Sequence, residues 1–163
     1  MQAAKPLNST PAFRSILVLC EANHCRSAIA ECLLRASLSK EINVESAGFN
    51  ALIGFPADSE AQQVTAEHGL DLSHHRGRQL TAAMVLSADL VLVMEQAQKD
   101  ACEELVPSAR GRIFLLGHWL SRPLQDISDP FHRGPASFRS AFEIIQQSVE
   151  SWLPCLVSKL RSA

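Results

Sequence analysis

Short apolar runs alternate along the chain with segments in which apolar residues recur every three or four positions. The runs are typical of strands buried on both faces of a parallel sheet, and they predict strands over 15–20, 42–46, 88–94 and 113–116. The other segments predict helices from 26 onward, from 58 or 59 to 68, in a short turn after 81, over 96–105 and over 138–156. This alternation favours an α/β fold of three layers with a four-stranded parallel sheet.

Three stretches lie outside this regular pattern. Residues 1–13 contain Pro6 and Pro11 among polar residues, and they predict a flexible leader before a single domain at 14–163. Pro154 lies inside the last predicted helix and should kink it or begin a separate piece. The long irregular stretch 117–134 is expected to be functional, because such stretches in compact domains are seldom idle.

Composition narrows the classes of protein that fit. The 163 residues are 47% hydrophobic, which suits one compact domain, and the net charge of -2 gives no overall attraction for nucleic acid. No window has the roughly 18 apolar residues of a spanning helix, and residues 1–12 lack the pattern of a signal peptide. Five cysteines is an odd number for a disulfide framework. We therefore expect a cytoplasmic protein with reduced thiols, no membrane insertion and no nucleic-acid partner.

The first predicted strand passes into the first predicted helix through the loop Cys20-Glu21-Ala22-Asn23-His24-Cys25-Arg26-Ser27. Such a junction gathers backbone N–H groups and the positive end of the helix dipole around one point, which makes an anion site. Arg26 adds a planar pair of donors suited to two oxygens of one phosphate. The same surroundings stabilise a thiolate at Cys20. The loop therefore predicts phosphate binding with Cys20 as nucleophile.

Two polar residues of the loop suit this chemistry. Ser27 is positioned to donate a hydrogen bond to the sulfur of Cys20, and Asn23 tolerates the left-handed backbone that turns loop amides inward. A Cys-x5-Arg pattern also arises by chance, and the alternative is a buried strand-end cysteine beside a surface arginine. The position between an apolar strand and an amphipathic helix favours the functional interpretation.

The chain resembles the low-molecular-weight protein tyrosine phosphatase family in two separated motifs, Cys20-x-x-Asn23-x-Cys25-Arg26-Ser27 and Asp129-Pro130-Phe131. The resemblance runs from Ile16 to the final helix, through 44–48, 68–70, 78–81, 94–95 and 116–119, and points to the bacterial members that accompany exopolysaccharide synthesis and act on tyrosine autokinases. It implies a phosphoric monoester hydrolase acting on a phosphotyrosine protein. It further implies a phosphocysteine intermediate on Cys20, with Arg26 holding the phosphoryl group.

The resemblance also implies that Asp129 protonates the leaving phenol and then deprotonates the attacking water. The residues support this independently, because an acid on an irregular segment beside a proline can reach an anion at the end of the first strand. A positioned proton donor typically accelerates such a step by about 10²- to 10⁴-fold. Asp126 is the nearby alternative, and either residue also fits an ordinary solvated loop carboxylate.

Supporting roles follow from the same resemblance: Ser46 and His75 hold Asn23, and Cys25 forms a protective disulfide with Cys20 under oxidation. For His75, a partly exposed turn residue is an equally plain interpretation. The adjacent histidines at 74 and 75 suggest a metal, but no third and fourth ligands follow at usable spacing. We therefore expect an enzyme without a metal or cofactor.

Three residues of the loop depart from the family pattern. Ala22 replaces a glycine and is strained if the backbone needs positive φ, and Glu21 opposes phosphate binding unless its side chain points into solvent. His24 replaces an aliphatic residue of the pocket wall and predicts binding that depends on pH near neutrality. The other walls of the substrate cleft are expected at Leu52 and Phe131, with simple loop packing as the alternative.

Two other functions fit the same loop. An arsenate reductase on this fold would use Cys20 to attack arsenate and would pass a disulfide to further cysteines. However, Cys102 and Cys155 have no evident close partner, and Asp129 has no purpose in that reaction. A phosphotyrosine-binding module with little turnover would need only the anion site. Hydrolysis of an aryl phosphate separates the three.

Overall fold

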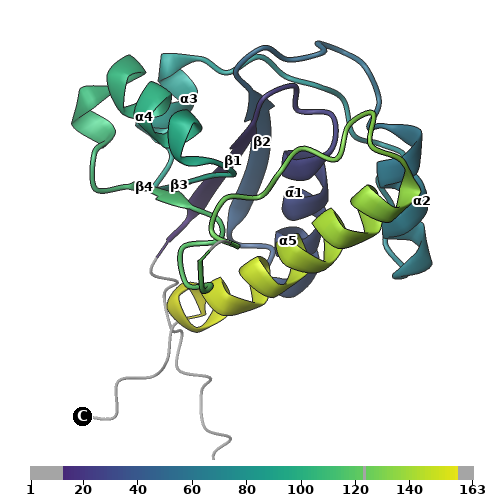
Figure 1. Ribbon diagram of the computed structural model, residues 1–163. Helices are drawn as coiled ribbons and strands as arrows, with labels where there is room; N and C mark the ends of the chain where they lie inside the picture. Colours follow the sequence, from purple (N-terminus) through teal and green to yellow (C-terminus); the bar gives the residue numbers. More distant parts are fainter. Residues whose placement is uncertain (1–12, 123, 158–163) are drawn as a thin grey trace, which may run out of the picture.

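The computed structural model describes residues 13–122 and 124–157 (Figure 1). At its centre lies one sheet of four parallel strands in the order β2-β1-β3-β4. The strands are β1 (Ser15–Cys20), β2 (Asn43–Gly48), β3 (Leu90–Val93) and β4 (Ile113–Leu115). The four-stranded parallel sheet predicted from the apolar runs is confirmed, although β3 is shorter than predicted.

Helices cover both faces of the sheet, because side chains alternate along each strand. Ile16 and Val18 of β1 face one core, and Leu17 and Leu19 face another. The helices are α1 (Arg26–Ser37), α2 (Ser59–Glu67), α3 (Ala82–Ser87), α4 (Gln96–Leu105) and α5 (Pro135–Leu156), with a short 3-10 turn, η1 (Pro107–Ala109). Figure 1 shows α1, α2 and α5 on one side of the sheet and α3 and α4 on the other. The three-layer prediction is therefore confirmed.

Two helices begin at the capping residues that the sequence suggests. Asp58 Oδ1 accepts a hydrogen bond from Glu60 N at 2.8 Å, at the start of α2. Thr81 Oγ1 accepts one from Met84 N at 3.3 Å, at the start of α3. Beyond the end of α2, Gly69 has a φ of 76°, a conformation that favours glycine.

Of the two alternatives expected at Pro154, a kink or a separate piece, the separate piece is absent, because α5 continues through this residue to Leu156. A proline inside a helix removes one backbone hydrogen bond, and α5 extends only two residues beyond Pro154. Trp152 and Leu156 are both buried in the core on either side of it. Their burial holds the final turn in place.

The leader predicted at 1–13 lies almost wholly outside the described residues. Phe13 falls inside them, and its side chain packs against the core on the side of α1 and α5. In the parts of the chain that the structure describes, no helix has the length and apolarity needed to cross a bilayer.

The carboxyl ends of the strands bring distant segments together at one edge of the sheet. Strands β1 and β2 pair so that Cys20 lies beside Gly48. A Cβ at Gly48 would lie 2.7 Å from the backbone N of Asn23 and 2.8 Å from the carbonyl O of Glu21. Only a glycine therefore allows the loop after β1 to cross so close to β2.

Candidate active site

The 20–27 loop leads directly from the end of β1 into the start of α1. Cys20 is the last residue of β1 and is 2% exposed. Helix α1 begins at Arg26, and the side chain of the N-cap residue, Cys25, makes no capping hydrogen bond. The amides of the first turn therefore have no side-chain cap, as an anion site requires.

A chain of hydrogen bonds surrounds the sulfur of Cys20. Cys20 Sγ and Ser27 Oγ lie 2.9 Å apart. Asn23 Nδ2 donates to Ser27 Oγ at 2.8 Å and to Ser46 Oγ at 2.9 Å. Because the Ser27 oxygen accepts from Asn23, the Ser27 hydroxyl hydrogen is available to the sulfur. The structure thus brings together the side chains that the sequence assigned to this loop and its support.

Asn23 has the left-handed backbone of the loop, with a φ of 52°. Its carbonyl oxygen pairs with His75 Nε2 at 2.8 Å, and its Oδ1 accepts from Arg78 N at 2.9 Å. The strain expected at Ala22 is absent, because Ala22 does not have positive φ. The positive φ falls at Asn23 instead, and asparagine tolerates this conformation better than most residues. The contact with Arg78 was not predicted, since a backbone amide carries no signal in the sequence.

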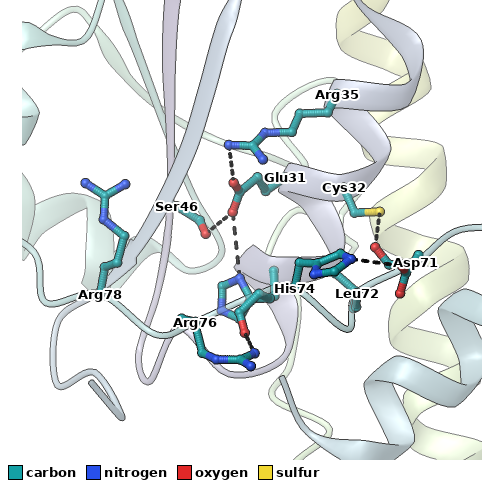
Figure 2. Close-up of a pocket in the computed structure, with 11 residues that line it drawn as sticks. Glu31, Cys32, Arg35, Ser46, Asp71, Leu72, His74, Arg76 and Arg78 are labelled. Atoms are coloured by element: carbon teal, nitrogen blue, oxygen red, sulfur yellow. Dashed lines mark hydrogen bonds and ion pairs between the residues drawn. The ribbon is translucent and has the colours of Figure 1, made fainter. Parts of the chain in front are cut away.

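Glu31 of α1 supports the loop from behind. The Ser46 hydroxyl donates to Glu31 Oε2, and Arg35 Nη2 lies 2.7 Å from Glu31 Oε1. His75 Nδ1 lies 3.9 Å from Glu31 Oε2. Figure 2 shows Glu31 between Arg35 and Ser46, in the wall of a cavity of about 420 Å³. One carboxylate therefore contacts both residues that hold Asn23, and nothing in the sequence singled it out.

Arg26 is 2% exposed, and acids from two other segments balance its charge. Its Nη1 donates to Glu95, which follows β3, and to the carbonyl of Ile127 at 2.8 Å. Its Nη2 lies 3.5 Å from Asp129 Oδ2. These contacts fix the guanidinium plane before an anion arrives. Glu95 was not identified from the sequence as a partner of Arg26. Its position just after β3, the strand beside β1, could have indicated this contact.

Asp129 reaches the site and Asp126 does not. Asp129 lines the same small cavity as Cys20, and its Oδ1 accepts a hydrogen bond from Phe131 N at 3.1 Å. Asp126 Oδ1 accepts instead from Gln96 N at 3.0 Å, at the start of α4. The geometry therefore favours Asp129 as the acid beside the nucleophile.

The cavity at Cys20 has a volume of about 40 Å³ and contains both residues expected as cleft walls, Leu52 and Phe131. Its full lining is Cys20, Ala22, His24, Cys25, Arg26, Leu52, Asp129 and Phe131. Leu52 N donates to Ala22 O at 3.0 Å, which holds the wall against the loop. Apolar side chains beside the polar residues of the loop suit the flat ring of an aryl ester.

Glu21 points away from this cavity. Its side chain is exposed, and its Oε1 accepts a hydrogen bond from Asn50 Nδ2 at 2.6 Å. It is not among the residues that line the cavity. Glu21 was expected to oppose phosphate binding unless its side chain points into solvent. Because this side chain is exposed and turned toward the neighbouring loop, its repulsion of a bound phosphate is reduced.

Two buried thiols near the sheet have shifted acidity. Burial raises the pKa of Cys25 well above its usual range, with a further increase from the charge of Asp58. Burial also raises the pKa of Cys102 to about 11. Both are therefore neutral thiols near neutral pH. Cys20 and Cys25 are free in the structure, and the disulfide between them stays a prediction.

The chain is similar over most of its length to known phosphatases. Residues 15–162 match the family described as low molecular weight phosphotyrosine protein phosphatase. The probable low molecular weight protein-tyrosine-phosphatase EpsP of Ralstonia nicotianae is 45% identical over 141 residues, which are 86% of this chain and 94% of that protein. The crystal structure of the Erwinia amylovora tyrosine phosphatase AmsI matches with a TM-score of 0.84 and 39% identity, over 88% and 93% of the two chains. The tyrosine phosphatase Wzb from Escherichia coli K30, in complex with sulphate, matches with the same TM-score and identity over 89% and 99%.

Proposed function

Because the chain belongs to the low molecular weight phosphotyrosine protein phosphatase family and is a phosphoric monoester hydrolase, we propose that it hydrolyses phosphotyrosine through a phosphocysteine intermediate on Cys20. One observation carries the proposal. A nucleophile and a buried cation from one loop, Cys20 and Arg26, line one small cavity together with an acid from a distant segment, Asp129. Each has a defined task in the transfer of a phosphoryl group to water.

In the first step, the Cys20 thiolate attacks phosphorus while Arg26 and the first amides of α1 bind the phosphoryl oxygens. The S–P bond forms as the bond from phosphorus to the aryl oxygen breaks, and the electron pair leaves on that oxygen. Asp129, as the carboxylic acid, gives its proton to the same oxygen, so that a phenol departs. The contacts of Arg26 Nη1 with Ile127 and Glu95 support this step, because the guanidinium needs little further ordering.

In the second step, water attacks the phosphorus of the intermediate. The Asp129 carboxylate accepts a proton from this water as the new P–O bond forms. The S–P bond breaks and its electron pair returns to Cys20, which leaves as a thiolate. The Ser27 hydroxyl, 2.9 Å from the sulfur, supports this role because it can donate a hydrogen bond to the departing thiolate. Inorganic phosphate is released, and Asp129 is again protonated for the next substrate.

The positions of Cys102 and Cys155 give less support to an arsenate reductase. Such an enzyme passes a disulfide from Cys20 to a second and a third thiol. Cys102 packs in the core cluster on the opposite face of the sheet from Cys20, and Cys155 is exposed on the last turns of α5. A binding module without turnover would need no proton donor, so it would not explain the position of Asp129 in the cavity. Both alternatives remain as arms of the test below.

The physiological substrate belongs to the same proposal. A tyrosine autokinase of exopolysaccharide synthesis is the expected partner, on the strength of the resemblance of the sequence to bacterial members that act on such kinases. A cytoplasmic location is expected with it, because a free Cys20 thiol persists in a reducing compartment. Loss of phosphotyrosine from a phosphorylated autokinase, with a phosphoserine protein as the control, tests the partner.

Hydrolysis of an aryl phosphate by the wild type and by Cys20→Ser, Asp129→Asn and Asp126→Asn tests the reaction, with a chelator present. We expect no turnover by Cys20→Ser and a kcat about 10²- to 10⁴-fold lower for Asp129→Asn. Asp126→Asn is the matched control and should keep full activity, because asparagine can still accept from Gln96 N. Turnover that survives Cys20→Ser, or anion binding without turnover by the wild type, would overturn the proposal. Thiol-dependent reduction of arsenate would favour the reductase.

A further inference from the structure

His24 forms the part of the cavity wall that carries a titratable ring. Its side chain lies beside Cys20 in the cavity lining and packs edge-on against Phe131, with ring centroids 5.8 Å apart. His24 Nε2 lies 3.5 Å from Asp58 Oδ2, and the Asp58 backbone N donates to the His24 carbonyl at 2.9 Å. Asp58 also caps α2 through its other oxygen, Oδ1. Imidazole and carboxylate are therefore held as a pair by fixed backbone.

The other ring nitrogen of His24 has no such partner. Nδ1 is buried, and among the residues that the structure describes it has no hydrogen-bond partner. A carboxylate beside Nε2 favours the proton on that nitrogen, which leaves Nδ1 as an acceptor in the neutral ring and a donor in the cation. Unpartnered buried polar atoms are rare, and each one needs an explanation such as a role in catalysis or in binding an ion.

The negative charge of Asp58 acts on the 20–27 loop. It is the largest electrostatic contribution to the raised pKa of Cys25, after the effect of burial. A carboxylate whose field reaches Cys25 also opposes an anion held by the same loop. When the ring of His24 is protonated, the pair is neutral and this repulsion is cancelled. When the ring is neutral, the repulsion remains.

We propose that the His24–Asp58 pair sets the affinity of the catalytic pocket for dianions, with His24 controlling its dependence on pH and Asp58 its overall strength. The inference rests on the proposed function, since it names a determinant of substrate binding at that site. The charged and titratable groups that face His24 are Asp58 at the start of α2, Asp129 on the segment after β4, and Cys20, Cys25 and Arg26 in its own loop. Any test must therefore separate His24 from these groups.

Sulfate is the suitable probe, because it stays a dianion across the pH range in which an imidazole titrates. We would measure its Kd by NMR titration of the full chain carrying Cys20→Ser, which removes the titration of the thiol and needs no turnover. Between about pH 5.5 and about pH 8, the affinity should fall about three- to tenfold more in the His24 protein than in His24→Gln, which is neutral at every pH. His24→Gln should match the His24 protein at the higher pH.

Asp58→Asn tests the second half of the pair, and asparagine is an equally good helix cap. It should bind sulfate about three- to tenfold more tightly at both pH values, because one negative charge is removed whatever the state of His24. The pair of His74 and Asp71, at 3.8 Å and far more exposed, supplies the matched control. His74→Gln should leave both the affinity and its pH dependence unchanged.

A second readout does not depend on substitution. By linkage, sulfate must favour the protonated ring, so adding it near neutral pH should move the ring resonances of His24 toward the imidazolium position and leave those of His74 in place. A pH dependence unchanged in His24→Gln, or no response of the His24 resonances to bound sulfate, would overturn the inference. Failure of the proposed function would instead appear as a lack of turnover by the protein that retains Cys20.

Discussion

Asn23 Nδ2 donates a hydrogen bond to the Ser46 hydroxyl at 2.9 Å, and this contact ties the loop that carries the nucleophile to β2. Asn23 also contacts Ser27, His75 and Arg78. It does so from a left-handed backbone, with a φ of 52°. One residue thus connects the conformation of the loop to three neighbouring segments.

This arrangement predicts an order of stability for two substitutions of Asn23. Both Asn23→Gly and Asn23→Ala lose the side-chain hydrogen bonds, but only alanine is penalised at positive φ. Asn23→Ala should therefore unfold with a free energy about 1 kcal/mol lower than that of Asn23→Gly, as measured by urea denaturation. Equal stability of the two variants would contradict the account of this loop.

Glu95 is expected to stabilise the fold through Arg26. Glu95→Gln leaves the charge of the buried guanidinium without its direct partner and should lower the free energy of unfolding by about 1–3 kcal/mol, reduced from the cost in a fully buried pair because Glu95 is partly exposed. Glu104→Gln, at an exposed position of α4, is the control and should change stability by less than about 0.5 kcal/mol.

Sulfate adds a second test of the same relationship. It supplies an anion to Arg26 and should bind Glu95→Gln more tightly than the wild type, so the same concentration of sulfate should raise the Tm of Glu95→Gln by more. Equal shifts of Tm would mean that Glu95 does not balance the charge of Arg26.

If Asp129 donates a proton to the leaving group, the loss of rate in Asp129→Asn should depend on how readily that group leaves without one. A nitrophenolate leaves readily without a proton, whereas an unsubstituted phenolate does not. Asp129→Asn should therefore lose about 10²- to 10⁴-fold in the phosphorylation rate with phenyl phosphate and clearly less with nitrophenyl phosphate. Single-turnover kinetics measures this step, and an equal loss with both substrates would assign Asp129 a different task.

Burial raises the pKa of Cys102 to about 11 and raises that of Cys25 further. A raised pKa keeps each thiol protonated in the fold until the pH rises toward that value. Native iodoacetamide treatment near pH 8, followed by peptide mapping, should therefore modify the exposed Cys155 and spare Cys25 and Cys102. Labelling of Cys102 as fast as Cys155 would contradict the assignment.

Local patterns predicted much of the fold. The apolar run before Cys20 and the helical spacing after Arg26 define a strand, a loop and a helix without any tertiary information. The caps of α2 and α3 follow from Asp58 and Thr81 for the same reason, since a capping side chain acts within two or three residues of itself. Whether α5 continues through Pro154 or a separate piece begins there was left open by the sequence, because the outcome depends on tertiary burial.

The site was predicted less completely than the fold. Cys20 and Arg26 lie within one loop and are visible as a motif, but their partners come from other strands and helices. Glu95 and Glu31 are ordinary carboxylates in the sequence, and only the sheet order and the position of α1 bring them to the loop. The contact between His24 and Asp58 likewise arises from packing, so the sequence indicated a titratable wall without its counter-ion.

The proposed mechanism requires a covalent bond between phosphorus and the sulfur of Cys20. Rapid acid quenching of the enzyme during turnover of a radiolabelled aryl phosphate, followed by peptide mapping, tests it most directly. We expect label on the peptide that contains Cys20. This label should be lost in Cys20→Ser and should persist longer in Asp129→Asn, where the attacking water is not deprotonated. Turnover with no labelled peptide, or label on another residue, would contradict this mechanism.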